Sequence, residues 1–481
     1  MTGTHKKSIS IFEALIPVLF LIGVLSINVR PLMFGDEATS GPNQFALLLA
    51  GALAAIIGFK HGFGYEYMLQ KVSKNIQSTS GAILILLFVG ALSGAWLISG
   101  IIPTMVYYGL QLLNPTIFLV SALIISALVS LIIGSSWSTT ATVGIALIGI
   151  GKALGFPIEM VAGAVISGAY FGDKMSPLSD TTNLASAIAE VDLYQHVRYM
   201  MYTTIPTFTV TLIVFAILGF THTNGQIQDT SLLLIDIKKV FFINPFLLLV
   251  PVIVIYLIIK KTPPLVALLV GTLLGGIVAM FFQTEVLSQL ISGEMSYLSK
   301  SYKAVMQAIV GDVQIQTDNK LLYKLFSSGG MGGMLNTIWL IISAMFFGGV
   351  MEAIGALKKI SETLLKLFKS TFGVFLSTDL TCILFNATAS DQYLAIVVPG
   401  KMYKQAFEDA KLAPENLSRT LEDSGTVTSV LIPWNTGGAY NAGVLGVSTE
   451  SYAVYAIFNW LSPIMTLIFA YFRIKIKKIV T

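Results

Sequence analysis

The sequence GSSWSTT at residues 134–140 interrupts an otherwise apolar stretch, 116–155, and the sequence NATASDQ at 386–392 interrupts a second one, 371–405. Backbone groups without hydrogen-bond partners cannot lie in lipid. Polar breaks of this kind are therefore typical of re-entrant hairpins or of discontinuous helices that are buried in protein. Their positions determine how the rest of the chain can cross a membrane.

The composition of the whole chain is that of a membrane protein. Of its 481 residues, 55% are hydrophobic and only 11% are charged, about half the charged fraction of an average soluble domain. The mean hydropathy is +0.79. A bilayer-spanning helix needs about 20 apolar residues. The segments that meet this requirement are 11–29, 44–60, 80–103, 159–189, 197–220, 242–260, 263–282, 336–357, 423–447 and 451–473.

Several classes of function find no support in the sequence. A net charge of +4 provides no strongly basic surface, so we expect no nucleic-acid partner. The single cysteine, Cys382, and four scattered histidines have no metal-ligand spacing. No nucleotide-binding motif is visible. We therefore expect neither an enzyme nor a protein with a bound cofactor.

Basic residues near the ends of the predicted spans indicate the topology, because such residues are enriched in cytoplasmic loops. Treating 116–155 and 371–405 as re-entrant hairpins makes all the clusters agree. Both chain termini are then cytoplasmic, and the segment 283–335 lies outside. The clusters are His5-Lys6-Lys7; Lys60, Lys71 and Lys74; Lys260 and Lys261; Lys358, Lys359, Lys366 and Lys369; and Arg473, Lys475, Lys477 and Lys478.

This layout divides the chain into two similar halves, 1–225 and 226–481. Each half holds five spans and one hairpin, and an odd number of spans gives the halves opposite orientations. In the first half the hairpin precedes a broken helix at 159–189, and in the second half it precedes one at 423–447. Paired broken helices at corresponding positions indicate the binding site of a secondary transporter. We therefore predict an all-α polytopic membrane protein with about ten transmembrane helices and two re-entrant hairpins, in two inverted-topology repeats.

Three carboxylates lie in or beside the polar interruptions: Asp173, Asp180 and Asp391. A carboxylate at membrane depth is costly unless it has a partner, so each is a candidate functional residue. The alternatives are a salt bridge between Asp173 and Lys174 and a position at a helix end in the headgroup region. Sodium prefers oxygen ligands, and a buried carboxylate can hold either a cation or a proton. Competition at one carboxylate is the minimal requirement for cation/proton exchange.

Hydroxyl and amide side chains in the same breaks could provide neutral ligands. We predict Na⁺ at Asp180, with Ser136 and Thr139 as the nearest hydroxyls. The alternative is that these hydroxyls bond only to helix carbonyls, as is common in membrane helices. Asp423 begins a predicted span and fits a helix N-terminal charge. The candidate neutral ligands are Ser135, Ser136, Thr139, Thr140, Thr181, Asn183, Asn386, Thr388, Ser390, Asn435 and Thr436.

Three motifs resemble the NhaC family of Na⁺/H⁺ antiporters, part of the ion transporter superfamily. They are GSSWSTTATVG at 134–144, FGDKMSPLSDTTNLA at 171–185 and PWNTGG at 433–438. The resemblance in helix layout covers nearly the whole chain. It implies inverted repeats, two re-entrant hairpins, a scaffold that can form a homodimer, and exchange of sodium for protons. Some relatives in this family exchange malate for lactate.

These observations predict a secondary active transporter in the cell membrane that exchanges Na⁺ or Li⁺ for H⁺ by alternating access. The alternative is an organic-acid exchanger of the malate/lactate type, coupled to Na⁺ or H⁺. Neither polar interruption contains an arginine, which disfavours an anion. A channel is less consistent with an inverted repeat that buries carboxylates. The expected partners are a small cation or a small organic acid, the lipid bilayer and a second copy of the chain.

Overall fold

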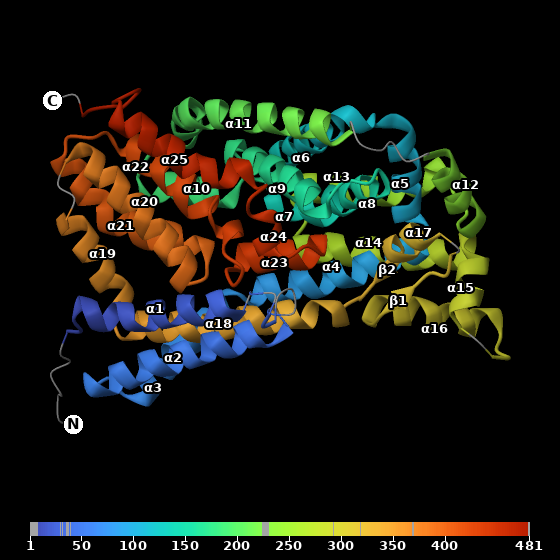
Figure 1. Cartoon of the computed structure of the whole chain (residues 1–481), viewed down its shortest axis with the longest axis horizontal. Coiled ribbons are helices and arrows are strands. Elements are labelled where there is room, and N and C mark those ends of the chain that lie inside the picture. Colours follow the sequence, from blue (N-terminus) through green and yellow to red (C-terminus); the bar gives the residue numbers. More distant parts are fainter. Residues whose placement is uncertain are drawn as a thin grey trace.

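The computed structural model in Figure 1 describes residues 8–28, 30, 32–34, 38, 40–223, 230–291, 293–317, 319–367 and 370–479. Within these ranges the chain consists of helices, turns and one small antiparallel ribbon of β1 (Val313–Gln314) and β2 (Ser327–Ser328). The long helix α11 (Leu193–Thr223) follows one edge of the molecule, and α1 (Ile11–Asn28) lies near the opposite edge (Figure 1). The predicted helical fold is confirmed for these residues.

Parts of the predicted topology lie outside the described residues. They are the basic residues His5-Lys6-Lys7, the cluster member Lys369, and the boundary between the two predicted halves at 225 and 226.

Eight helices among the described residues are long and apolar enough to cross a membrane, or nine when a bent pair is counted as one span. Six of them coincide with predicted spans, and two are first arms of the predicted hairpins. The helices are Ile11–Asn28 (α1), Pro42–Lys60 (α2), Ser80–Ile98 (α4), Pro115–Ile133 (η2 and α6), Leu193–His222 (within α11), Pro264–Phe282 (α14), Gly332–Ala353 (η5 and α18) and Thr371–Thr388 (α20).

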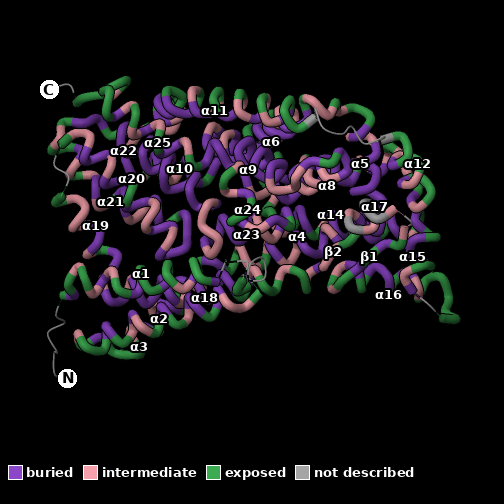
Figure 2. Tube along the Cα trace, viewed as in Figure 1, coloured by how far each residue is buried: buried purple, intermediate pink, exposed green. Residues whose placement is uncertain are grey.

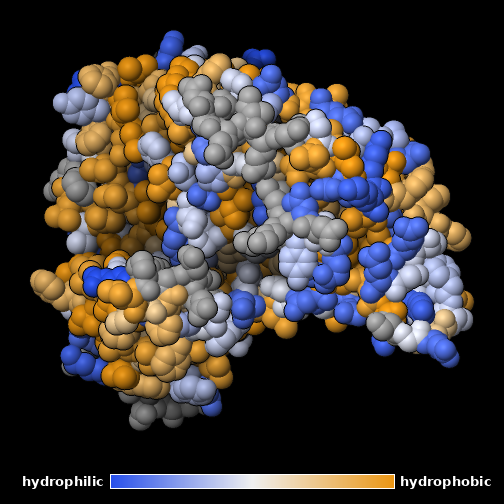
Figure 3. Space-filling view, turned by 45° about the vertical axis from the view of Figure 1, so that its right-hand side comes forward, coloured by the Kyte–Doolittle hydropathy of each residue, from blue (hydrophilic) through white to orange (hydrophobic). Residues whose placement is uncertain are grey.

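Apolar side chains cover much of the surface seen in Figure 3. Leu128 on α6, Ile217 on α11 and Leu273 on α14 are each more than half exposed. Buried residues predominate along the interior helix α9 (Ile158–Met175), whereas the outer helix α11 carries many exposed residues (Figure 2). Exposed apolar side chains of this kind fit a protein that is surrounded by lipid.

The predicted span 242–260 begins at a sharp bend. Helix α12 (Thr230–Val240) and the segment Pro245–Ile259, which contains η4 and α13, meet at an angle of 83°. Asn244 caps the second segment by accepting a hydrogen bond from the Phe246 amide, 3.1 Å away. Pro245 has no amide hydrogen to continue a helix from α12. The local sequence therefore ends one helix and starts another.

The two stretches predicted as hairpins are helix–turn–helix units. In the first, α6 (Phe118–Ile133) ends at Gly134, whose φ of 74° is left-handed, and the chain resumes as α7 (Ser136–Thr139), η3 and α8. In the second, α20 (Thr371–Thr388) turns through residues 389–391 into α21 (Gln392–Asp409), and the two helices pack against each other. Both turns coincide with the predicted polar runs.

Each unit is followed along the chain by a broken helix. Helix α9 (Ile158–Met175) and helix α10 (Asp180–Ile188) are separated by the four residues 176–179. In the second half, α22 (Pro414–Leu421) runs into the π-helical segment η6 (Glu422–Thr426), and after a short irregular stretch α23 (Thr436–Leu445) begins. Both breaks contain a proline, Pro177 or Pro433, which disfavours a continuous helix.

Glycine lets α9 approach α6 closely. A Cβ at Gly168 would lie 2.2 Å from the carbonyl oxygen of Leu123, and one at Gly172 would lie 2.3 Å from that of Ala127. Any side chain at either position would push the helices apart. This contact fixes the C-terminal end of α9 beside the turn at Gly134 and so positions Asp173.

The remaining helices complete the fold. They are η2 (Pro115–Ile117), α3 (Tyr65–Ser78), α5 (Ile101–Leu112), η3 (Thr140–Gly144), α8 (Ile145–Ala153), η4 (Pro245–Leu248), α13 (Leu249–Ile259), α15 (Thr284–Leu290), α16 (Tyr297–Val310), α17 (Lys320–Leu325), η5 (Gly332–Met334), α18 (Leu335–Ala353), α19 (Ala356–Leu367), η7 (Ser429–Leu431), α24 (Thr449–Tyr452) and α25 (Ile457–Tyr471).

Candidate functional site

Four helices begin at the polar turns and breaks, and a side chain caps each of them. Ser135 accepts a hydrogen bond from the Ser138 amide at 3.2 Å, and Ser179 accepts one from the Thr182 amide. Asp391 accepts from Leu394 at 3.0 Å, and Asn435 accepts from Gly437 at 2.9 Å. Such caps satisfy amide groups that have no partner within the helix. They explain why polar residues stand at these points of an apolar chain.

A cavity of about 250 Å³ lies where these helix ends meet. It contains carboxylates from three elements: Asp173 on α9, Asp180 on α10 and Asp391 before α21. None of the residues that line it is a Lys, Arg or His. Its lining comprises Ser78, Thr79, Gly81, Ala82, Ile85, Ser135, Trp137, Ser138, Ala141, Asp173, Asp180, Ile258, Pro264, Leu268, Asp391, Gln392, Tyr393, Thr436 and Tyr440.

The three carboxylates differ in exposure and in partners. Asp173 is 5% exposed, and its Oδ2 accepts hydrogen bonds from the amide and the hydroxyl of Ser136, at 3.1 and 2.7 Å. Its Oδ1 is buried without a partner in the described structure. Asp180 is exposed and accepts a 2.5 Å bond from the Tyr393 hydroxyl. Asp391 is also 5% exposed. Asp180 therefore lies at the mouth of the cavity, and the other two lie deeper.

The structure brings only part of the predicted ligand set to the cavity. Ser135, Thr436 and the three carboxylates line it. Ser136 instead donates to Asp173, and the Thr139 hydroxyl donates to the Ser135 carbonyl at 2.9 Å. The predicted residues that do not line it are Ser136, Thr139, Thr140, Thr181, Asn183, Asn386, Thr388, Ser390 and Asn435.

Several of these other residues hold the turns in place. The side-chain amide of Asn386 donates to the backbone carbonyl of Gly425 at 2.7 Å. The side-chain amide of Asn435 donates to the backbone carbonyl of Asn386 at 2.9 Å. These bonds tie the turn before α21 to the break before α23. Thr388 bonds within its own helix, to the Leu384 carbonyl. In the described structure their visible role is therefore architectural.

Two aromatic residues connect the polar breaks of the two halves. The rings of Trp137 and Tyr440 stack with their centroids 4.3 Å apart and their planes 15° from parallel. The Tyr440 hydroxyl also donates to the Trp137 carbonyl at 2.9 Å. The stack forms one wall of the cavity, so a movement of α7 relative to α23 would change the shape of the site.

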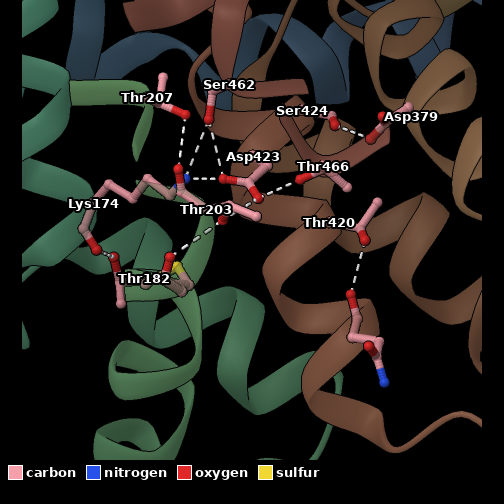
Figure 4. A network of polar contacts seen from close by, with 12 residues as sticks. Lys174, Thr182, Thr203, Thr207, Asp379, Thr420, Asp423, Ser424, Ser462 and Thr466 are labelled. Atoms are coloured by element: carbon pink, nitrogen blue, oxygen red, sulfur yellow. Dashed lines mark hydrogen bonds and ion pairs between the residues drawn. The ribbon is translucent and has the colours of Figure 1, made fainter. Parts of the chain in front are cut away.

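A second polar region lies beside the cavity and is fully buried (Figure 4). Lys174 forms an ion pair with Asp423, and both side chains are 0% exposed. Asp423 also accepts hydrogen bonds from Ser462 at 3.0 Å, from Thr203 at 2.9 Å and from Thr466. The alternative of a salt bridge between Asp173 and Lys174 is therefore wrong, because Lys174 pairs with Asp423. The interpretation of Asp423 as a charge at a helix start is also wrong, because Asp423 is an interior ion-pair partner.

Three more charged side chains surround this ion pair. Asp379 accepts a hydrogen bond from Ser424. Arg419 is fully buried and lies over the Tyr199 ring, 4.7 Å from its centroid. Glu422 is fully buried, and neither of its oxygens has a hydrogen-bond partner in the described structure. These five charged groups come from α9, α20, α22 and η6, which places both halves of the chain in one network.

Sequence reasoning missed the importance of Glu422 and Asp423. The signal that could have found them is a pair of acids followed by Ser424, Gly425 and Thr426, a polar run inside an apolar region. Lys174 and Asp423 are 249 positions apart, so their pairing could not be read from local spacing. Among the described residues, no group of three His, Cys, Asp or Glu side chains is arranged to hold a resident metal ion.

Comparisons with known proteins give consistent results. A model described as the Na⁺/H⁺ antiporter family matches residues 168–474. The Malate-2H(+)/Na(+)-lactate antiporter of Bacillus subtilis is 37% identical over 465 residues, covering 96% of this chain and 94% of the relative. The Na(+)/H(+) antiporter NhaC of Alkalihalophilus pseudofirmus is 34% identical over 460 residues, 96% of each chain. The arginine/ornithine antiporter ArcD of Halobacterium salinarum is 35% identical, covering 97% and 93%.

Proposed function

The chain belongs to the Na⁺/H⁺ antiporter family, and from this premise we propose that it moves Na⁺ across the membrane in exchange for H⁺ by alternating access. The observation that carries the proposal is the cavity with three carboxylates and no basic side chain in its lining. Carboxylate, hydroxyl and amide oxygens suit a hard monovalent cation. The same carboxylates can take up a proton when the cation leaves.

The proposed Na⁺ site comprises the cavity-lining candidates Asp173, Asp391, Ser135 and Thr436, with Asp180 at the entrance. Asp173 and Asp391 are shielded from water, so their charge acts on a bound ion with little screening. Four capped helix starts adjoin the site. Since these ends carry partial positive charge, the ionised carboxylates are themselves stabilised there. The remaining predicted residues support the turns that hold these ligands.

The proposed architecture is two inverted repeats, 1–225 and 226–481, with the turns at 134–135 and 389–391 as tips of re-entrant hairpins. Its support is the repeated order of elements. In each half a helix–turn–helix unit precedes a broken helix, and a capped helix follows each turn and each break. Alternating access would follow from movement of these units against the long helices. Cytoplasmic termini and a homodimer complete the proposed arrangement.

A second candidate is exchange of an organic acid such as malate for lactate. The identity of 37% to a malate/lactate antiporter favours it. The absence of Lys and Arg from the cavity lining argues against it, because a dicarboxylate would meet three carboxylates and no counter-charge. We therefore rank Na⁺/H⁺ exchange first.

The decisive experiment uses proteoliposomes that contain only this protein and a trapped pH dye. We expect pulses of Na⁺ or Li⁺ to shift the internal pH, and pulses of K⁺ to leave it unchanged. A response to malate in the absence of a response to Na⁺ and Li⁺ would replace the proposal with the organic-acid alternative.

A further inference from the structure

A cavity of about 420 Å³ lies where the C-terminal segment of the chain meets the beginning of α11. Helix α11 packs against α22 and α25 at this end of the molecule, near the C-terminus (Figure 1). The described residues that line the cavity include three cations, Arg198 on α11 and Lys475 and Lys477 after α25. The acid among them is Glu415, at the start of α22. This lining has the opposite charge to that of the cavity that contains Asp173, so it suits an anion.

Hydrogen bonds hold the C-terminal segment against α11 and the start of α22. The Ala413 amide donates to the Lys477 carbonyl at 3.0 Å. The Lys477 amide donates to the Tyr199 hydroxyl at 3.1 Å, and this hydroxyl lies 2.5 Å from the Lys475 carbonyl. Tyr199 is buried, so the segment is anchored to the interior of the protein. The side chains of Lys475 and Lys477 therefore extend from a backbone whose position is fixed.

Two of the three cations have no acidic partner among the described residues. Lys477 forms an ion pair with Glu415, whereas neither Arg198 nor Lys475 forms a salt bridge. The Lys475 ammonium lies over the Tyr202 ring, 5.1 Å from its centroid. Arg198 lies one turn before Tyr202 on the same face of α11, so both cations lie beside the same ring. A guanidinium and an ammonium that are not neutralised by carboxylates are suited to binding phosphate.

The cavity adjoins an apolar surface. Tyr202 in its lining and Tyr471 at the end of α25 both have exposed side chains. Exposed tyrosines are enriched where a protein passes from lipid to water. Further along α11, the side chains of Ile205, Ile213 and Ile217 are exposed on the same face of the helix as Tyr202. A ligand with its anionic group in the cavity could therefore lay an apolar tail along this face.

We propose that this cavity binds the phosphate group of an anionic phospholipid. Arg198 and Lys475 bind the phosphate, and the face of α11 that exposes Ile205, Ile213 and Ile217 contacts the acyl chains. A free phosphate ion would meet the same two cations but would leave the apolar face uncovered, so the observations favour a lipid. A zwitterionic headgroup brings its own cation and matches an excess of positive charge less well. The bound lipid would link α11 to the C-terminal segment.

The test measures lipid binding to the purified full-length protein in detergent, and it does not depend on which ion is transported. The unfolding temperature is followed as phosphatidylglycerol is added, with phosphatidylcholine and inorganic phosphate added in parallel experiments. A ligand that binds the folded state raises this temperature as its concentration exceeds the Kd. We expect phosphatidylglycerol to raise the unfolding temperature, and the other two compounds to leave it unchanged at the same concentration.

Variants of the two cations test their role. Arg198→Gln and Lys475→Gln should each raise the phosphatidylglycerol concentration that gives half of the shift about fivefold, and the double variant should raise it more than about tenfold. Lys260→Gln is the matched control. Lys260 is also exposed and lies over a tyrosine ring, 5.6 Å from the Tyr256 centroid, but it does not line this cavity. This variant should respond to the lipid as the wild type does.

The other outcomes overturn the proposal. A wild-type protein that phosphatidylglycerol does not stabilise has no such site. An unchanged lipid dependence in the double variant would exclude the cavity, and the two single variants decide in the same way if the double variant does not fold. An equal loss in Lys260→Gln would indicate a general attraction to surface charge. A full shift with inorganic phosphate would assign the cavity to a soluble anion, and an equal shift with phosphatidylcholine would exclude a role for the headgroup charge.

Discussion

Asp173 and Asp423 are both buried carboxylates beside the polar breaks, yet they stand in opposite electrostatic settings. Asp423 is bonded to Lys174 and to three hydroxyls, which neutralises its charge and satisfies its oxygens. Asp173 accepts from the amide and hydroxyl of Ser136, and its Oδ1 makes no hydrogen bond among the residues that the structure describes. Both lie in the interior, and Lys174 is the residue next to Asp173 in the chain.

The difference indicates which carboxylate is available for an ion. A paired carboxylate in a dry interior would have to lose its partner before it could bind a cation, and breaking a buried pair is costly. A carboxylate with a free oxygen at a cavity needs no such rearrangement. We therefore interpret the Lys174–Asp423 pair as the structural link between the halves, and the cavity carboxylates as the exchangeable ones.

The largest effect is expected from breaking the link. Asp423→Ala leaves the buried, charged Lys174 without the carboxylate it is paired with, which should lower the free energy of unfolding by about 3–5 kcal/mol. The loss of stability is measured by thermal unfolding in detergent and by the yield of monodisperse protein. The double variant Lys174→Met with Asp423→Leu removes both charges and should recover most of the loss. A stable Asp423→Ala protein would show that the pair is not the structural link.

The next largest effect is expected at Asp173 and concerns function rather than folding. Asp173→Asn keeps the size of the side chain and removes the charge, so the Na⁺ concentration for half-maximal exchange should rise at least about tenfold. Because the native Oδ1 has no hydrogen bond to lose, the unfolding temperature without Na⁺ should change little. Transport in proteoliposomes measures the predicted change in Na⁺ dependence, and thermal unfolding measures the predicted lack of change in stability. Asp173→Glu keeps the charge and should retain weak exchange.

Comparison of these residues shows how far the sequence alone can lead. The breaks at 134–140 and 386–392 were predictable because Gly134 and the capping side chains act on their own neighbours in the chain. Asp173, Asp180 and Asp391 could be proposed together for the same local reason. The partners of Lys174 and Ser136 could not be predicted, since packing of distant helices determines them. The exposure of the Asp180 side chain could not be predicted either, because it depends on which distant segments cover the start of α10.

A smaller effect is expected at the mouth of the cavity. Asp180→Asn removes an exposed charge, and exposed charges are screened by water and salt. The half-maximal Na⁺ concentration should rise by about two- to fivefold, a change of roughly 1 kcal/mol or less. The difference from wild type should shrink as choline chloride is raised, since steering by surface charge weakens with ionic strength. A complete loss of exchange in well-expressed Asp180→Asn would instead place the main Na⁺ ligand at Asp180.

The smallest effect is expected from Tyr393→Phe, which removes the hydroxyl that donates to Asp180 at 2.5 Å and leaves the ring in place. Asp180 keeps its charge and its 2.9 Å bond from the Thr181 amide, so its electrostatic contribution remains. The half-maximal Na⁺ concentration should change by less than about twofold, because a single bond at an exposed site contributes little. If Tyr393→Phe equalled or exceeded Asp180→Asn in effect, the hydroxyl would itself be a ligand or a gate, and the contrast between the mouth and the buried carboxylates would fail. Measuring both variants in the same proteoliposome preparation, with the amount of reconstituted protein determined for each, makes this comparison direct.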